Sequence, residues 1–257
     1  MKTYIIGNWK MNFSTGESSL YLHKLLNKVP SYRDIEVVVA PSTLSLQSLS
    51  LQTERRKIKL AAQNAYAADY GAFTGETAMA SLRGIVNYCL VGHSERRHIF
   101  GESDKDVRAK VAAALRFGIT PILCVGETEI ERDMKETASV IKDQLLGGLS
   151  DVSKEDLDKV IIAYEPVWAI SGHGKATIAK PSDVDEVVKL IRETLAATYS
   201  KKIAENIPVL YGGSVKTTNA AAYLSVPGVN GLLIGGASLI ASEFLGIIDI
   251  AKRTIVE

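Results

Sequence analysis

The chain has 257 residues, of which 46% are hydrophobic, with 30 Lys and Arg against 29 Asp and Glu. Because the charges nearly balance, no basic excess is available to attract nucleic acid. No segment approaches the run of about 20 apolar residues that a membrane span needs, and residues 1–10 hold too short an apolar run for a signal peptide. A chain of this length buries roughly three-quarters of its unfolded surface, which allows one large core.

Eight short apolar runs recur along the chain, with helical patterns between them. Several, such as residues 37–40, are apolar almost throughout, as expected for parallel strands that are covered on both faces. The expected strands are residues 4–8, 36–40, 59–63, 88–92, 120–125, 160–164, 207–211 and 231–234.

Amphipathic segments fill the intervals, and the clearest covers residues 184–198, whose apolar side chains recur on one helical face. Helix starts are expected where two capping residues stand three apart, at Ser14 with Glu17, Ser103 with Asp106, and Ser182 with Asp185. Gly118 is expected to end a helix.

Strict alternation of strand and helix predicts a parallel sheet with right-handed crossovers. An open doubly wound sheet is the alternative, but that fold usually carries a glycine-rich fingerprint after its first strand. Here the first strand is followed by Asn-Trp-Lys-Met-Asn at 8–12. We therefore expect an α/β protein, a single (β/α)8 barrel with eight parallel strands over residues 1–257.

The two cysteines, Cys89 and Cys124, both lie inside apolar runs. A small buried thiol is the ordinary role of cysteine in such a run, and two of them make no disulfide framework. We therefore expect reduced thiols and a cytoplasmic protein.

Functional residues of such barrels gather at the carboxyl ends of the strands. The side chains and glycines expected there are Asn8, Lys10, His93, Glu95, Glu165, Tyr211, Gly212, Gly213, Ser214, Gly235 and Gly236. Each has an ordinary alternative, such as a solvated lysine, a polar turn histidine or a turn glycine. Their recurrence at five strand ends favours one shared site.

Glu165 ends the sixth expected strand, and Pro166 turns the backbone away. Partial burial raises the proton affinity of a carboxylate, which suits a general base that removes a proton from carbon. The alternative is a strand-end glutamate that is solvated or paired with arginine. The apolar residues 167–170 and the small residues 171–174 then predict a hinged hydrophobic lid.

A phosphate group is the expected ligand of the glycine pairs. Gly235 and Gly236 precede an expected helix start, where backbone N–H groups and the helix dipole favour an anion. Residues 212–214 supply further N–H groups from the neighbouring strand. The expected substrate is therefore a small phosphorylated molecule.

Five segments, in the same order, resemble the triosephosphate isomerase family. They are NWKMN (8–12), VGHSERR (91–97), AYEPVWAI (163–170), YGGSV (211–215) and IGGASL (234–239), and they span nearly the whole chain. The resemblance implies an isomerase of glycolysis and gluconeogenesis that interconverts dihydroxyacetone phosphate and glyceraldehyde 3-phosphate through an enediolate, without cofactor or metal.

The resemblance also implies a role for each polar group. Glu165 is then the base, and His93 the electrophile that polarises the carbonyl. Lys10 supplies a fixed positive charge and Asn8 a neutral donor. Glu95 is expected either to pair with Lys10 or to act only as an acid in the first turn of a helix.

By the same resemblance, the lid consists of Pro166, Val167, Trp168, Ala169, Ile170, Gly172, Lys175 and Ala176, with Tyr211 and Ser214 as the groups that hold it closed. Most members continue with Gly-Thr-Gly-Lys, whereas this chain has Ser-Gly-His-Gly-Lys at 171–175. Without a gap, Ser171 takes the place of a phosphate-binding glycine; a shift of one residue puts Gly172 there. We adopt the ungapped register, in which a glycine-like φ at Ser171 would cost about 1–2 kcal/mol on closure.

Residues 71–76 form an expected exposed loop with an aromatic residue at its tip. In the family this loop, here with Phe73, Thr74 and Glu76, inserts into a twin subunit, and its acid pairs with the arginine that matches Arg96. The resemblance therefore implies a two-fold homodimer with a self-complementary interface. The alternative is a mobile surface loop.

Other chemistries are less consistent with these residues. The four histidines, at 23, 93, 98 and 173, lack the spacing of zinc ligands. A Schiff-base aldolase needs a lysine inside the barrel, and Lys59 is the one candidate on an expected strand. A non-catalytic relative is the third reading, and the presence of Lys10, His93 and Glu165 argues against it.

Overall fold

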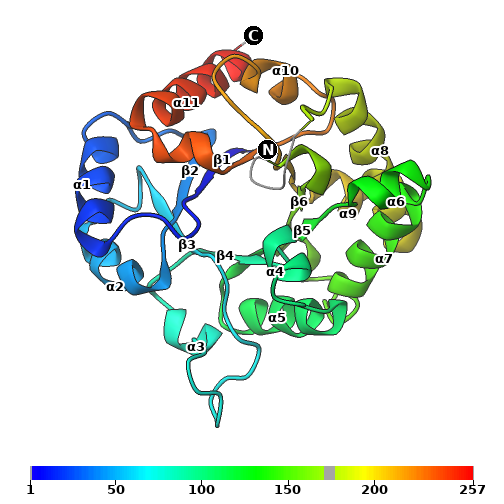
Figure 1. The fold of residues 1–257 in the computed structure, drawn as a ribbon, viewed down its shortest axis with the longest axis horizontal. Coiled ribbons are helices and arrows are strands. Elements are labelled where there is room, and N and C mark those ends of the chain that lie inside the picture. Colours follow the sequence, from blue (N-terminus) through cyan, green and yellow to red (C-terminus); the bar gives the residue numbers. More distant parts are fainter. Residues whose placement is uncertain (1, 171–176, 257) are drawn as a thin grey trace.

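The computed structural model of the chain describes residues 2–170 and 177–256. Eight parallel strands close into a barrel in which each strand pairs with the next and the last pairs with the first. Helices surround the barrel on the outside (Figure 1). The predicted (β/α)8 fold is therefore confirmed. The strands are β1 (Thr3–Asn8), β2 (Ile35–Ala40), β3 (Lys59–Ala62), β4 (Tyr88–Val91), β5 (Thr120–Val125), β6 (Ile161–Tyr164), β7 (Val209–Tyr211) and β8 (Gly231–Ile234).

The helices of the described residues lie between these strands and after the last one. They are α1 (Thr15–Leu26), α2 (Thr43–Gln52), α3 (Met79–Leu82), α4 (Ser94–His98), α5 (Asp104–Arg116), α6 (Glu129–Asp133), α7 (Thr137–Leu149), α8 (Pro181–Thr198), α9 (Lys201–Asn206), α10 (Ala220–Leu224) and α11 (Ala241–Val256), with 3-10 turns η1 (Leu157–Lys159), η2 (Val167–Ala169) and η3 (Gly236–Leu239). Within this described part, none is both long and apolar enough to cross a membrane.

All eight predicted strands are present, with ends that differ from the expected ones by at most two residues. The largest difference is at β7, which begins at Val209 rather than at residue 207. Ile207 is the C-terminal cap of α9, and Pro208 has no N–H to contribute to a strand ladder. The strand therefore starts only after the proline.

Two of the three predicted helix starts are confirmed. Ser14 with Glu17 and Ser103 with Asp106 form capping boxes at α1 and α5. The third prediction, at residues 182 and 185, is wrong: α8 begins at Pro181, and Asp183 accepts a hydrogen bond from Lys180 N at 2.8 Å. Proline with its fixed φ occupies the first helical position, so the cap lies before it.

Apolar side chains pack in two layers that fix the barrel. The first lies inside the barrel and comes from the strands alone, including Ile6, Leu90 and Leu233. The second lies between strands and helices. It includes all five apolar residues of the predicted α8 face: Val184, Val187, Val188, Ile191 and Leu195.

Both cysteines are buried and free, as expected. Burial raises the pKa of Cys89 to about 12 and raises the pKa of Cys124 well above its ordinary value. Both side chains are therefore neutral thiols at physiological pH.

Candidate active site

Side chains from several strand ends meet at a cavity of about 430 Å³ at the carboxyl end of the barrel. The predicted residues that line it are Asn8, Lys10, His93, Glu165, Gly212, Gly213, Ser214, Gly235 and Gly236. The structure thus brings together predicted groups from β1, β4, β6, β7 and β8. Val215, Lys216, Thr217, Thr218, Ile240 and Glu243 also line the cavity and were not predicted.

Glu165 directly follows β6, and its backbone N–H donates to Val125 O on the adjacent strand. The side chain is only 3% exposed. Two glycines make room for this residue: a Cβ at Gly126 would lie 1.9 Å from the backbone atom Glu165 O, and one at Gly212 would lie 2.8 Å from the side-chain atom Glu165 Cγ. Sequence reasoning missed Gly126, although its position right after the fifth strand was a usable signal.

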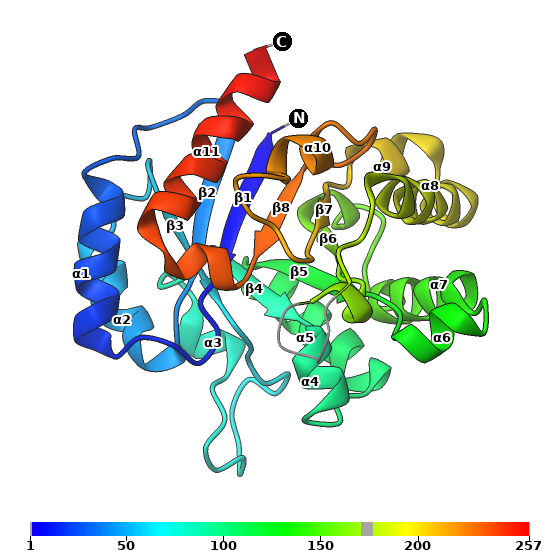
Figure 2. The same cartoon turned by 45° about the horizontal axis from the view of Figure 1, so that its top comes forward.

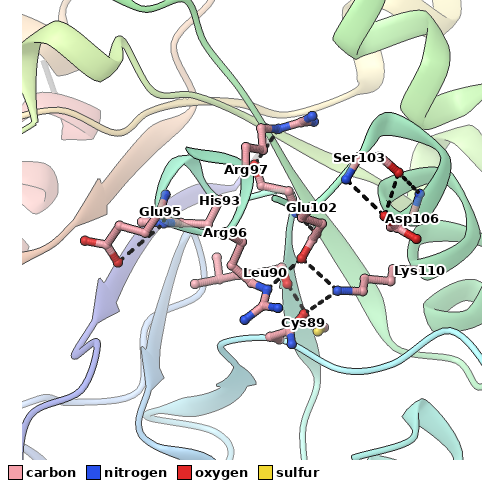
Figure 3. Close-up of polar contacts among 12 residues, drawn as sticks. Cys89, Leu90, His93, Glu95, Arg96, Arg97, Glu102, Ser103, Asp106 and Lys110 are labelled. Atoms are coloured by element: carbon pink, nitrogen blue, oxygen red, sulfur yellow. Dashed lines mark hydrogen bonds and ion pairs between the residues drawn. The ribbon is translucent and has the colours of Figure 1, made fainter. Parts of the chain in front are cut away.

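The carboxylate of Glu165 faces the ring of His93. Glu165 Oε1 lies 3.3 Å from His93 Nε2, and Oε2 accepts from Ser94 N at 3.3 Å. On the other side of the ring, Nδ1 accepts from Glu95 N at 3.2 Å (Figure 3). Because Nδ1 is an acceptor here, the proton of the neutral ring belongs on Nε2, which faces Glu165.

Lys10 is positioned from three directions. Its Nζ forms an ion pair with Glu95 Oε1 at 2.6 Å, which is one of the two roles expected for Glu95 from the sequence. Its N–H donates to Asn8 Oδ1 at 3.0 Å, and its carbonyl accepts from Gln63 Nε2 at 2.7 Å. Lys10 also has a φ of 52°, a conformation that costs a non-glycine residue about 1–2 kcal/mol. The ammonium group is therefore held at a defined place in the cavity wall.

A buried ion cluster supports the turn that carries His93. Glu102 Oε2 pairs with Arg96 Nε at 2.6 Å and with Lys110 Nζ at 2.7 Å (Figure 3). Its Oε1 accepts from Gly92 N. Burial opposes the ionisation of Glu102, but the hydrogen bonds from Lys110 and Arg96 outweigh it and hold the pKa of Glu102 below its ordinary value. This cluster joins residues of the β4–α4 turn and α5 that no local pattern connects.

The glycines after β8 open the turn η3, and Gly235 lies against Lys10, whose Cε would be 3.5 Å from a Cβ at Gly235. A Cβ at Gly236 would meet nothing within 4 Å, so this backbone borders open space. Ser238 Oγ donates to Gly235 O at 2.7 Å and fixes the turn. Among the described residues, the N–H groups of Gly235 and Gly236 donate no backbone hydrogen bond, so they are available to an anion at the glycine-lined end of the cavity.

The residues after Glu165 fold back on the barrel as the turn η2. Ala169 and Ile170 are buried, and Ala169 O accepts from both Ser214 N at 3.1 Å and Ser214 Oγ at 2.9 Å. Trp168 Nε1 donates to Glu127 Oε1 at 2.8 Å. Ser171, Gly172, Lys175 and Ala176 lie outside the described residues.

Tyr211 is fully buried on β7, and its ring packs on that of Tyr223 at 4.2 Å between centroids. Burial raises its pKa, so the hydroxyl stays protonated. Within the described chain, its oxygen has no hydrogen-bond partner.

The segment between β3 and α3, which carries Phe73, Thr74 and Glu76, projects from the barrel (cyan in Figure 2). All three residues are exposed, and Phe73 packs on Tyr66 at 4.5 Å between ring centroids. Arg96 pairs within its own chain, with Glu102.

The geometry argues against the Schiff-base alternative. Lys59 opens β3, which places it at the amino end of the strand, and it forms an ion pair with Glu36 away from the cavity. Such a lysine is not placed for a Schiff base with a ligand of that cavity. In the part of the chain that the structure describes, no three His, Cys, Asp or Glu residues cluster as a metal site would require.

A buried acid–imidazole pair and a lysine at the carboxyl end of the strands are the arrangement of a (β/α)8-barrel enzyme. The family model described as triosephosphate isomerase matches residues 3–251. A triosephosphate isomerase of Natranaerobius thermophilus is 41% identical over 98% of this chain and 97% of its own. One of Streptococcus mutans is 38% identical over 98% of this chain and 99% of its own. The chain therefore belongs to the triosephosphate isomerase family.

Proposed function

We propose that the protein interconverts dihydroxyacetone phosphate and glyceraldehyde 3-phosphate through an enediolate, as a step of glycolysis and gluconeogenesis and with no cofactor. Membership of the family supports the reaction. The observation that carries the mechanism is the pair formed by Glu165 and His93, whose Oε1 and Nε2 are 3.3 Å apart in a cavity that Lys10 also lines. We place this activity in the cytoplasm, where free thiols such as Cys89 and Cys124 stay reduced.

In the proposed mechanism, Glu165 takes a proton from the carbon beside the carbonyl, and the electron pair left behind moves onto the carbonyl oxygen. The Nε2–H of His93 donates a hydrogen bond to that oxygen, and the ammonium group of Lys10 offsets its charge. Asn8 Oδ1 accepts from Lys10 N, which fixes the amide group and leaves its donor, Nδ2, for the substrate. Glu165 returns the proton to the neighbouring carbon while His93 moves a proton between the two oxygens, so no co-reactant is consumed.

The phosphate group would lie at the glycine-lined end, against the N–H groups of Gly235 and Gly236 and beside Ser214. These residues line the same cavity as Glu165, so one small substrate can reach both ends. Backbone N–H groups suit a phosphate because they donate hydrogen bonds and add no side-chain bulk.

A coupled assay of the purified protein with glyceraldehyde 3-phosphate tests this function. We expect rapid conversion that needs no added metal and persists in the presence of a chelator. No turnover above the uncatalysed rate would contradict the proposal.

The lid is proposed to protect the intermediate, because an enediolate exposed to water can expel its phosphate group. If Ser171 takes the place of a phosphate-binding glycine, Ser171→Gly removes a closure cost of about 1–2 kcal/mol. We expect the variant to change the rate of lid closure more than the rate of proton transfer. Steady-state kcat and KM are the measurement, and values equal to those of the parent would refute the prediction.

We also propose a homodimer in which the loop with Phe73, Thr74 and Glu76 inserts into the twin subunit near Arg96. A cavity of about 370 Å³ lined by Met11, Glu95 and Arg96 among others borders this region, and Met11 is 98% exposed in the single chain. This cavity can accept the tip of the partner's loop, and the exposed Met11 beside it offers apolar surface that the loop would bury.

Thr74→Arg is expected to convert the dimer to a monomer, because an added charge at the loop tip would have to be buried in the interface without a partner. Sedimentation velocity at micromolar concentration measures the change, with Thr137→Arg at the start of α7 as the control that should leave the dimer intact. A Thr74→Arg variant that still sediments as the parent dimer would be evidence against this interface.

A further inference from the structure

Two segments from different strands form the glycine-lined end of the cavity. Residues 212–219 follow β7, and residues 235–240 follow β8 and lead into α11. The ladder between these two strands is short, with the single register pair Tyr211 and Leu232. The sheet alone therefore fixes the spacing of the two segments weakly, and other contacts must set it.

One side chain bridges the gap. Glu243, in the first turn of α11, accepts from Thr217 N at 3.2 Å and from Thr217 Oγ1 at 3.1 and 3.3 Å. In the described chain, these are the only hydrogen bonds between residues 212–219 and the segment from 235 to the first turn of α11. Both Thr217 and Glu243 line the cavity.

The packing around Thr217 allows it to lie close to α11. A Cβ at Gly246, one turn further along α11, would lie 2.7 Å from Thr217 Cγ2, so a glycine is needed for Thr217 to sit against the helix. Other hydrogen bonds hold the loop together and tie its start to the turn η2: Lys216 N donates to Asn219 Oδ1, Asn219 Nδ2 donates to Ser214 O, and both Ser214 N and Ser214 Oγ donate to Ala169 O. These bonds make the loop one unit that is anchored at η2, and the contact of Thr217 with Glu243 then sets its position relative to α11 and η3.

We propose that Glu243 is a positioning residue for the phosphate group of the substrate. Acting through Thr217, it holds the Ser214 segment at the distance from Gly235 and Gly236 that a phosphate group requires. The inference rests on the proposed function, because it concerns the phosphate end of the same cavity. Glu243 keeps its negative charge, so it acts on the phosphate group through Thr217, whose N–H and O–H donate to the Glu243 oxygens, and not by direct contact.

The reacting end of the cavity is held by different contacts. Glu165 is fixed by Ser94 N and His93 by Glu95 N, and neither contact involves Thr217 or Glu243. Loss of the Thr217–Glu243 contact should therefore weaken the binding of the phosphate group and leave the rate of proton transfer nearly unchanged. The effect should appear with a phosphorylated substrate and be absent with glyceraldehyde, which has no phosphate.

The test compares Glu243→Ala, Glu243→Gln and Thr217→Val with the parent, using glyceraldehyde 3-phosphate and, separately, glyceraldehyde. We expect Glu243→Ala to raise KM for the phosphorylated substrate about 10-fold, the size of effect of a lost charge-assisted hydrogen bond. Glyceraldehyde turnover should stay at the parent value. Thr217→Val keeps its N–H and should show a smaller rise, and Glu243→Gln keeps an acceptor oxygen and should recover most of the parent affinity.

Glu17→Ala is the matched control, since it removes the first-turn carboxylate of α1, which caps that helix outside the cavity. It should lower the melting temperature without raising KM. If Glu243→Ala does not fold, the KM values of Thr217→Val and Glu243→Gln for glyceraldehyde 3-phosphate provide the test. An unchanged KM in a folded Glu243→Ala or Thr217→Val variant, an equal loss with both substrates, or the same KM rise in Glu17→Ala would overturn the inference. A parent protein without isomerase activity would instead overturn the proposed function.

Discussion

Glu165→Gln is expected to lower kcat by at least about 10²-fold while the protein stays folded. Glutamine has nearly the size and shape of glutamate, so its side chain fits the space that Gly212 leaves. Its amide, however, is not basic enough to take a proton from carbon. The kcat with glyceraldehyde 3-phosphate measures the loss, and circular dichroism confirms that the variant is folded.

Glu36→Gln provides the control for this result. Glu36 is also a buried glutamate, but it pairs with Lys2 and Lys59, away from the cavity. The same chemical change there should cost stability and leave kcat unaltered. A folded Glu165→Gln protein with kcat near that of the parent would remove Glu165 from the role of base.

Lys10→Met is expected to weaken the binding of a phosphorylated transition-state mimic by about 10²-fold, the effect of removing one fixed donor from a developing oxyanion. Methionine keeps the length of the apolar stem and loses the ammonium group that lies 2.6 Å from Glu95 Oε1. The free energy of unfolding should change much less, because this ion pair is partly exposed. Inhibition constants and denaturant titrations give the two quantities.

Lys59→Met removes a lysine from an ion pair on the opposite side of the barrel. It should change stability and leave the inhibition constant at the parent value. If the Lys10→Met protein bound the mimic as tightly as the parent does, Lys10 would have no part in stabilising the intermediate.

Much of the fold was predictable because the signals are local. Eight apolar runs alternate with amphipathic segments, and the rule that parallel strands end at one rim is enough to place Glu165, His93 and Lys10 together. The failed helix start at residues 182 and 185 has an equally local cause. A Ser–Asp pair three apart satisfies the capping pattern, but Pro181 already fixes the first turn.

The supporting contacts were not predictable because they join residues far apart in the chain. Gly126 makes room for the backbone of Glu165, and Glu243 meets Thr217 from another helix. No periodic pattern or motif in the sequence links the two residues of such a pair. They come together only when the barrel closes. The sequence also does not decide whether Ser171 or Gly172 takes the place of the phosphate-binding glycine, because that depends on backbone angles.

Proton transfer to and from carbon is the central claim, and nuclear magnetic resonance of the reaction in D₂O tests it most directly. With dihydroxyacetone phosphate as substrate, we expect deuterium from the solvent to appear on carbon during turnover, because the proton held by Glu165 can exchange before it returns. Glu165→Gln should slow this exchange together with isomerisation. Full retention of hydrogen on carbon during rapid isomerisation is the result that direct hydride transfer predicts, and it would contradict a proton that exchanges with solvent while Glu165 holds it.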